Sequence, residues 1–211
     1  MRGEHTISTD EKTGIQALER IAPTKPPRPG LIERIEGEYK RHGTLCLTAD
    51  FEVATGEIAS YTIAATRNEQ DFANHIEQAI AADPSAPWTL VADHLNTHLS
   101  ATLVERVAEW CGITDDLGEK GKSGILKNKA SRTAFLAYQS HRIRIVYTPK
   151  HCSWLNQVEM WFSVLVRRLL KRSSFTSLAD LRARIEKFIA YFNAVLARPY
   201  RWTYTGRALA A

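Results

Sequence analysis

Three acidic residues stand where their surroundings could support catalysis: Asp10, Asp93 and Glu159. Asp10 follows a short extended stretch, and Asp93 ends the apolar run Leu90-Val91-Ala92. In open α/β sheets, binding sites form at the carboxyl ends of strands, which is where both aspartates would lie. Taken alone, either aspartate could instead cap the loop or helix that follows it.

Glu159 occupies an unusual position on an expected helix. On a helical wheel it lies about 100° from Val158, at the border of a buried stripe that contains Trp161 and Phe162. A carboxylate beside such apolar bulk is costly unless it is paired or bound to a metal ion. The alternative is a glutamate that extends to the surface and pairs with a nearby arginine.

Carboxylates from two strand ends and one helix could converge on Mg²⁺ or Mn²⁺, because both ions prefer oxygen ligands. Two such ions about 4 Å apart would activate a water or hydroxyl nucleophile and stabilise the leaving oxygen in phosphodiester chemistry. This assignment links the three acids to one reaction, although their spacing alone does not establish it.

Other chemistries have weaker support in the sequence. Adjacent side chains rarely face each other, which disfavours a thiol–imidazole pair at His151-Cys152. The two histidines after Asp93 lack further zinc ligands. The stretch Gly121-Lys122-Ser123 lacks the earlier glycine of a phosphate-binding loop, so we exclude a nucleotide-binding loop there.

The chain has 211 residues, of which 44% are hydrophobic and 24% are charged. These values fit one large globular domain, or one medium domain with additions, and argue against disorder. No apolar run approaches the roughly 18 residues of a membrane span, so we expect no membrane partner. Three scattered cysteines suit neither a disulfide framework nor a zinc cluster, which indicates a reducing, cytoplasmic setting.

Charge is unevenly distributed along the chain, whose formal net charge is +5. From residue 141 onward there are 13 Lys and Arg but 3 Asp and Glu, whereas residues 1–140 hold 15 and 20. A strongly basic last third suggests a polyanionic partner. A solvated basic helix face would give the same count, so charge alone leaves both explanations open.

Hydrophobic periodicity predicts a mixed α/β domain. The expected elements are an extended stretch at 5–9, a hairpin over 43–65, a helix over 69–81, a strand over 88–92, a helix over 102–111, a strand over 142–147, a helix from an N-cap at Ser153 to Arg172, and a last helix from Ser177 to Asn193. The proline-rich residues 22–30 should form an irregular crossing, and the Gly/Lys-rich residues 112–132 a mobile insertion outside the core.

Four blocks of the sequence resemble the transposases of bacterial insertion sequences in the DDE superfamily. Residues 8–20, STDEKTGIQALER, resemble the block around the first catalytic acid, and Asp93-His-Leu-Asn-Thr-His98 resembles the block around the second. Residues 147–162, YTPKHCSWLNQVEMWF, are similar to the third-acid block of the insertion-sequence 630 family, relatives of the mariner elements. Residues 200–206, YRWTYTG, look like the C-terminal signature.

This resemblance implies an RNase H-like fold, a mixed β-sheet flanked by helices, with Asp10, Asp93 and Glu159 as catalytic acids that hold two Mg²⁺ or Mn²⁺ ions. It implies cleavage of DNA at transposon ends and strand transfer into target DNA, typically at a TA step, by a homodimer. Residues beside the second and third acids would shape the pocket: Asn96, His98, Asn156 and Gln157. We expect cations of the insertion and of the third block to contact DNA: Lys120, Lys122, Lys127, Lys129, Lys150, Arg167, Arg168, Lys171 and Arg172.

The expected organisation is a single catalytic domain over residues 1–206, with the insertion at 112–132 and a short tail at 207–211. The insertion would explain why Asp93 and Glu159 are farther apart than is usual in mariner-like enzymes. Only nine residues precede Asp10, so we expect the family's N-terminal helix-turn-helix domains to be absent here and an upstream polypeptide of the same element to recognise the ends. The alternatives are a truncated, inactive remnant with residual DNA binding and a stand-alone RNase H-like nuclease.

Overall fold

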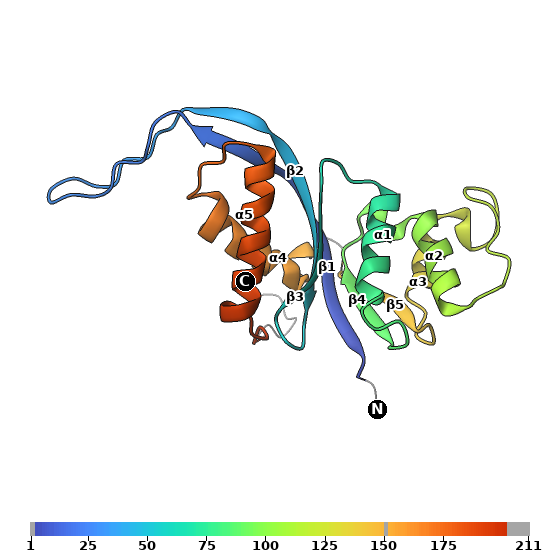
Figure 1. Cartoon of the computed structure of the whole chain (residues 1–211). Helices are drawn as coiled ribbons and strands as arrows, with labels where there is room; N and C mark the ends of the chain where they lie inside the picture. The colour runs from blue at the N-terminus through green and yellow to red at the C-terminus, as the bar shows by residue number, and fades with distance from the viewer. Residues whose placement is uncertain (1–2, 150–151, 202–211) are drawn as a thin grey trace, which may run out of the picture.

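The fold is built on a five-stranded mixed sheet with the order β3-β2-β1-β4-β5. The computed structural model describes residues 3–149 and 152–201. The strands are β1 His5–Arg20, β2 Tyr39–Glu52, β3 Ile58–Ala64, β4 Trp88–Ala92 and β5 Ile143–Tyr147. β1, β2 and β3 pair antiparallel, whereas β4 runs parallel to β1 and β5 parallel to β4 (Figure 1). This mixed α/β arrangement confirms the predicted class.

Four of the five α-helices in the described residues follow the strands in the predicted order, whereas the short helix that begins at Lys129, inside the expected insertion, was not predicted. The five helices are α1 Glu69–Ile80, α2 Ala101–Cys111, α3 Lys129–Leu136, α4 Gln157–Leu165 and α5 Leu178–Tyr191. Short 3-10 turns occur at η1 Asn96–Leu99, η2 Ile125–Lys127 and η3 Ser153–Leu155, and π-helical segments extend α4 as η4 Val166–Leu170 and α5 as η5 Phe192–Leu196. Asn68, Ser100 and Ser177 cap α1, α2 and α5 through their side chains, because each accepts backbone N–H bonds of the first turn.

Two apolar cores pack on the sheet, one on its parallel half and one on its antiparallel half. Ile7, Trp88, Leu90 and Ile143 pack against α1 and α2 around the parallel strands. The antiparallel half, with Leu47 and Phe51 among its residues, packs against α4 and α5. Figure 1 shows α4 and α5 beside β2 and β3, with α1, α2 and α3 toward β4 and β5. The catalytic candidates lie where these two halves meet, along β1.

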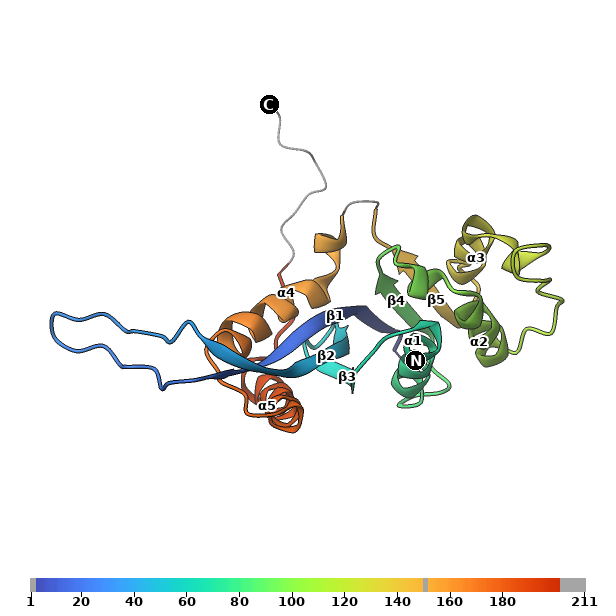
Figure 2. The same cartoon turned by 90° about the horizontal axis from the view of Figure 1, so that it is seen from above.

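The first strand is longer than the predicted stretch at 5–9. It continues to Arg20 because β2 supplies a partner along almost its whole length, with register shifts between Lys12 and Ile15 and between Gln16 and Leu18. Asp10 therefore lies within a paired strand, opposite Ala49, rather than after one. The two strands continue into a thin arm over residues 21–38, closed by bridges Lys25↔Arg34 and Arg28↔Leu31, which projects from the body of the domain (Figure 2).

Two local predictions were wrong. The helix expected to begin at Ser153 begins after Asn156, because a 3-10 turn precedes it, and Trp154, predicted to be in the buried stripe, is half exposed. The insertion at 112–132 is not excluded from the core: η2 buries Leu126 against Val107 and Leu136 of the first core. An Asn128–Ser131 capping box then starts α3.

Gly118 and Gly124 close the base of the loop that precedes η2. Both have positive φ, and a Cβ at Gly118 would lie 2.4 Å from the carbonyl oxygen of Ser123. Only glycine therefore permits this approach. Lys150, His151 and residues 202–211, which include most of the C-terminal signature and the tail, lie outside the described residues. In the described ranges 3–149 and 152–201, no helix combines the length and hydropathy needed to cross a membrane.

Candidate active site

Asp10 and Asp93 lie at the same edge of the sheet because their strands are parallel neighbours. Ser8 pairs with Val91, and each chain then continues two residues in the same direction, to Asp10 and to Asp93. Asp10 is 5% exposed and Asp93 is half-buried in the loop after β4. The predicted position at the carboxyl end of a strand therefore fits Asp93, whereas β1 continues past Asp10.

A buried hydrogen-bond cluster holds the third acid's helix against β1. The Ser8 hydroxyl donates to Asn156 Oδ1 and accepts from the N–H of Val158, at 2.9 Å. Asn156 Nδ2 donates to the Thr9 carbonyl oxygen, at 2.8 Å, and lies 3.5 Å from Asp10 Oδ2. Asn156 is fully buried. This cluster fixes the first turn of α4, and with it Glu159, beside Asp10.

The pKa of Asp10 depends on the charges of the other two acids. Burial is the main cause that raises the pKa of Asp10 to about 7. The negative charges of Asp93 and Glu159 act in the same direction, and the hydrogen bond from the Glu11 N–H and the charge of His98 oppose the rise. The two other acids are therefore close enough to repel the Asp10 carboxylate. Glu159 is half-buried and forms no ion pair within the described part of the chain, so the surface pairing considered for it is not observed.

His98 connects Asp93 to a fourth acid, Glu11. His98 Nδ1 lies 2.9 Å from Asp93 Oδ1, and Nε2 lies 3.0 Å from Glu11 Oε2. Burial alone would lower the pKa of His98, but hydrogen bonds to Asp93 and Glu11 and the charges of Glu11 and Asp10 raise it to about 9. The hydrogen bond from His98 in turn lowers the pKa of Asp93. The protonated ring thus keeps Asp93 ionised and fixes its orientation.

A divalent cation fits this arrangement of oxygen donors. Asp10, Glu11 and His98 bring one potential ligand atom each within 4.8 Å of one another. Both ring nitrogens of His98 already face carboxylates, however, so a protonated His98 is a positioning group here rather than a ligand. Asp10, whose raised pKa reports uncompensated negative charge, together with Asp93 and Glu159 offers a donor set suited to Mg²⁺ or Mn²⁺.

The remaining residues predicted to shape the pocket have different surroundings. Asn96 is exposed, and its Oδ1 accepts a hydrogen bond from Lys129 Nζ at 2.6 Å, which ties the start of α3 to the loop after Asp93. Gln157 is the first residue of α4, and its Oε1 is buried without a hydrogen-bond partner among the described residues. Asn156 and His98 are the two that contact the acids directly.

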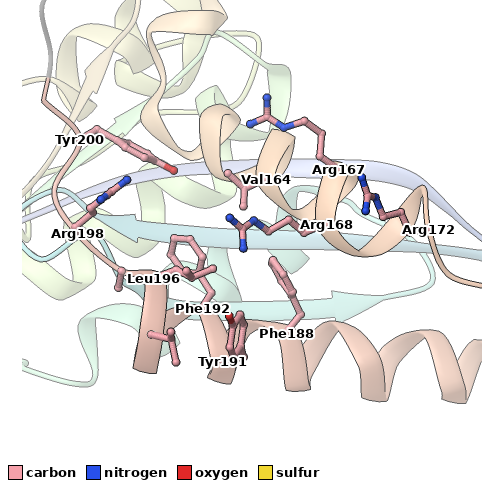
Figure 3. A pocket seen from close by; sticks show the side chains of 12 residues that line it. Val164, Arg167, Arg168, Arg172, Phe188, Tyr191, Phe192, Leu196, Arg198 and Tyr200 are labelled. Carbon is pink, nitrogen blue, oxygen red and sulfur yellow. The ribbon is translucent and has the colours of Figure 1, made fainter.

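The residues predicted to contact DNA fall into separate groups. In the insertion, Lys120 pairs with Glu69 at 3.1 Å and Lys122 with Glu119 at 2.5 Å, while Lys127 ends η2 at the surface. At the other end of the domain, Arg167, Arg168 and Arg172 line a pocket between η4 and α5 (Figure 3). Lys171 lines a smaller cavity beside β1, and Lys150 is outside the described residues.

Sequence reasoning missed Glu11, Ser8 and Tyr147 as parts of the site. Glu11 has a side chain 1% exposed, and Tyr147 donates from its hydroxyl to the His98 carbonyl oxygen at 2.9 Å. The available signal for Glu11 was its position next to Asp10 in the sequence. The partners of the three missed residues in the site lie between 49 and 150 positions away in the sequence, so spacing could not identify them.

Comparison with known proteins gives a family match and matches to solved structures. The family model described as "DDE superfamily endonuclease" matches residues 5–182. A pre-cleavage Mos1 transpososome structure aligns with 88% of this chain and 48% of the other, at a TM-score of 0.56 and 10% identity. The Mos1 mariner paired-end complex with Mn aligns with the same shares at a TM-score of 0.56 and 11% identity. No curated protein is significantly similar in sequence.

These likenesses establish the fold. The five-stranded mixed sheet flanked by helices matches the RNase H-like fold of the Mos1 catalytic domain, which confirms the predicted fold class. The chain spans about half the length of the solved transposase chains that it matches.

Proposed function

The chain belongs to the DDE superfamily endonucleases, and from this premise we propose that it is the metal-dependent catalytic domain of a DNA transposase of the bacterial insertion-sequence 630 type. One observation carries the proposal: the negative charges of Asp93, after β4, and Glu159, on α4, both act on the buried Asp10 carboxyl group of β1. The proposed reaction cuts a phosphodiester bond at a transposon end and transfers the freed 3′-hydroxyl to target DNA, at TA steps.

In this proposal Asp10, Asp93 and Glu159 hold two Mg²⁺ or Mn²⁺ ions. When bound, such ions would favour the deprotonated nucleophile and stabilise the leaving oxygen. The protein's own contribution is to hold the carboxylates in place: Asn156 fixes Asp10 relative to α4, and His98 fixes Asp93. Because these positioning bonds are buried, the carboxylates require little reorganisation when a cation or a phosphate approaches.

DNA is the proposed substrate because the solved relatives are described as transposon-end and paired-end complexes. We propose that the domain acts as a homodimer on two ends, in the bacterial cytoplasm, at the nucleoid when bound to DNA. Recognition of the terminal repeats is assigned to a helix-turn-helix segment outside this RNase H-like domain, on whichever polypeptide of the element carries it. The domain itself, over residues 1–206, would supply the chemistry.

The test is metal-dependent nicking of supercoiled plasmid DNA by the purified chain, with Mn²⁺ or Mg²⁺ added to an EDTA-treated sample. We expect nicking with metal, and a loss of about 10²–10³-fold in rate for Asp93→Asn and for Glu159→Gln, as for other lost transition-state stabilisers. Glu105→Gln, an exposed acid on α2, is the matched control and should nick like the parent. If Asp93→Asn and Glu159→Gln nick as fast as the parent, the site assignment is wrong.

Cation binding can be measured separately from cleavage. Mn²⁺ should raise the melting temperature of the parent, because an ion that binds the folded state alone stabilises it. Asp10→Asn should abolish this shift while leaving the metal-free melting temperature nearly unchanged or raised, since it removes a buried charge. A chain that binds Mn²⁺ but never nicks would be an inactive remnant. One that cuts RNA–DNA hybrids in preference to duplex DNA would be a stand-alone nuclease.

A further inference from the structure

A pocket between η4 and α5 has features that catalysis at Asp10 does not use. Its volume is ≈ 880 Å³, within the range of small-molecule sites. Its walls come from η4, α5, η5 and the segment after η5, which surround it in Figure 3. The residues that line it divide into a cationic group and an aromatic group.

The cationic group consists of four arginines: Arg167, Arg168, Arg172 and Arg198. In Figure 3, Arg167 on η4 and Arg172 just after η4 lie at one rim, Arg168 points between the two helices, and Arg198 lies on the opposite side. Within the described residues none of the four forms an ion pair, whereas Arg106, Arg144 and Arg184 elsewhere do. Four unpaired guanidinium groups around one pocket call for an anionic ligand, and arginine suits phosphate in particular.

Tyr200 supplies a further donor at the same place. Its hydroxyl is buried without a hydrogen-bond partner among the described residues. Burial raises the pKa of Tyr200, and the charges of Arg167 and Arg198 oppose this rise, so both guanidinium groups are near the phenol. The ring is fixed by stacking on Phe51, with centroids 4.8 Å apart and planes 6° from parallel. A phosphate oxygen between the two arginines would accept a hydrogen bond from the Tyr200 hydroxyl.

The backbone that carries Arg198 is also fixed. Gly56, in the turn between β2 and β3, has φ of +79°, and a Cβ there would lie 2.0 Å from the Arg198 carbonyl oxygen. Such an approach is possible only for glycine. The segment of Arg198 and Tyr200 is therefore held against the sheet on one side and faces the pocket on the other.

The aromatic group forms the floor and one wall. Phe188 and Tyr191 lie on α5, and Phe192 on η5, with Tyr191 49% exposed. A half-exposed aromatic ring next to unpaired arginines is the combination by which proteins hold single-stranded nucleic acids: rings stack on bases while cations contact phosphates. A duplex would use only the arginines, because the faces of its bases are covered by stacking on the neighbouring base pairs.

Both π-helical segments of the described chain border this one pocket. η4 contributes Arg167 and Arg168, and η5 contributes Phe192, Val195 and Leu196. π-Helical residues are well under 1% of residues in proteins and occur mostly at functional sites. Their meeting here is a second observation, independent of charge, that marks the pocket as a binding site.

We propose that this pocket binds a single-stranded DNA segment, with phosphates on Arg167, Arg168, Arg198 and the Tyr200 hydroxyl and one unpaired base against Tyr191. The proposal rests on the proposed function in that DNA is the polymer supplied. The geometry relates the two sites: Arg167 follows Glu159 on one continuous helix, eight residues or about 12 Å further along. A strand whose end lies at the acids can therefore extend to the pocket.

The experiment measures fluorescence anisotropy of a labelled thymidine oligonucleotide of about 12 nucleotides, within the site sizes of known single-strand binders, in EDTA and low salt. The same length of duplex is the second probe. We expect the parent to bind the single strand, Tyr191→Ala to weaken this binding about tenfold and duplex binding less than about twofold, and Tyr191→Phe to bind like the parent. The double variant Arg168→Ala, Arg198→Ala should bind both probes more weakly than the parent does, with at least a tenfold loss of affinity for the single strand.

Matched controls remove similar groups outside the pocket. Lys187→Ala takes a charge from the exposed face of α5, and Tyr138→Ala takes an exposed ring at the end of α3. Both should bind as the parent does. The proposal fails if Tyr191→Ala reduces the affinity for the two probes equally, or reduces neither. It also fails if Lys187→Ala weakens binding as much as the double arginine variant does.

The two proposals fail in different ways. A parent that nicks plasmid with Mn²⁺ while the pocket variants bind the oligonucleotide unchanged keeps the proposed function and refutes the pocket. If the parent never nicks plasmid DNA but binds the single strand, and the Tyr191 and paired arginine variants lose this binding, the pocket is supported and the catalytic role is refuted. Melting temperatures of all variants, measured alongside, exclude loss of folding as the cause.

Discussion

Asn156 is the residue through which the strand of the first acid and the helix of the third are joined. Its side chain accepts a hydrogen bond from Ser8, donates one to the Thr9 carbonyl oxygen and approaches Asp10. All of these groups are buried, so no water can replace the bonds cheaply. Asn156 therefore combines two roles, since the bonds that stabilise the strand–helix contact also orient a carboxylate.

Asn156→Ala should destabilise the domain by about 2–4 kcal/mol, because it removes the acceptor of the buried Ser8 O–H and a donor to the Thr9 carbonyl oxygen. Urea unfolding followed by circular dichroism measures this loss. Asn74→Ala is the control, since the Asn74 amide is exposed on α1 and bonds only to Gln70 in the described structure. Equal midpoints for the two variants would show that the cluster around Asn156 contributes nothing.

A second buried polar pair lies away from the acids, between β2 and α1. Asp50 Oδ2 lies 3.0 Å from His75 Nε2, the Ser60 hydroxyl donates to the same carboxyl group, and Thr62 Oγ1 is 2.9 Å from His75 Nδ1. Both members of the pair are at most 1% exposed. In the described structure it belongs to no pocket that contains the acids, which assigns it to the attachment of α1 to the sheet.

His75→Ala should cost about 3–5 kcal/mol, because removal of one partner leaves the Asp50 carboxyl group buried and uncompensated. The exposed pair Lys122–Glu119 is the contrast: Lys122→Ala should cost less than about 1 kcal/mol. Denaturant midpoints of the two variants decide the matter. A loss for His75→Ala as small as that for Lys122→Ala would mean that the pair does not hold α1.

Site residues could be predicted from the sequence only where their neighbours in the chain form a recognisable pattern. Asp10, Asp93 and Glu159 were chosen from strand ends, a helical wheel and the resemblance of three blocks. Glu11 and Ser8 escaped notice because their importance comes from His98 and Asn156, which approach from distant elements. Local spacing identifies groups that share a face of one element, whereas contacts between elements need the topology.

At the scale of elements, α3 shows where composition misleads. Four glycines and several lysines between residues 112 and 132 favour a loop, and the helix that follows is only eight residues long. It is nevertheless fixed, because Arg132 donates to the carbonyl oxygens of Leu99 and Leu126 and Leu126 is buried. The elements with a clear apolar pattern, α1, α2, β4 and β5, agree with their predicted positions to within about two residues.

Leu126→Ala tests whether residues 112–136 are part of the folded domain. Because Leu126 is 5% exposed in the core of α2 and α3, its truncation should cost about 2–5 kcal/mol. Leu31→Ala, on a half-exposed leucine of the arm, should cost less than about 0.5 kcal/mol. Thermal and urea unfolding compare the two. A dispensable insertion would instead give equal, small losses.

At the scale of the whole molecule, the domain is a sheet with a core on each side of β1 and an arm that leaves it. The arm exposes apolar side chains, among them Ile32, which is 84% exposed, and between residues 25 and 34 its backbone hydrogen bonds are those of its own two bridges. Figure 2 shows it extending past α5 without covering either core. The arm should therefore contribute little to the stability of the domain, because stability depends on buried apolar area and the arm buries almost none.

Replacing residues 26–33 with Asn-Gly should therefore leave the fold intact. The bridge between Lys25 and Arg34, with N···O distances of 2.9 and 3.0 Å, would then be closed by a two-residue turn of the type that fits antiparallel strands. We expect the free energy of unfolding to change by less than about 1 kcal/mol, since loop length affects stability only weakly. Leu45→Ala, at the buried base of the same hairpin, should cost about 2–5 kcal/mol. If the shortened arm destabilises the chain as much as Leu45→Ala does, the arm packs on the body in solution, and the two-core description must be extended to include it.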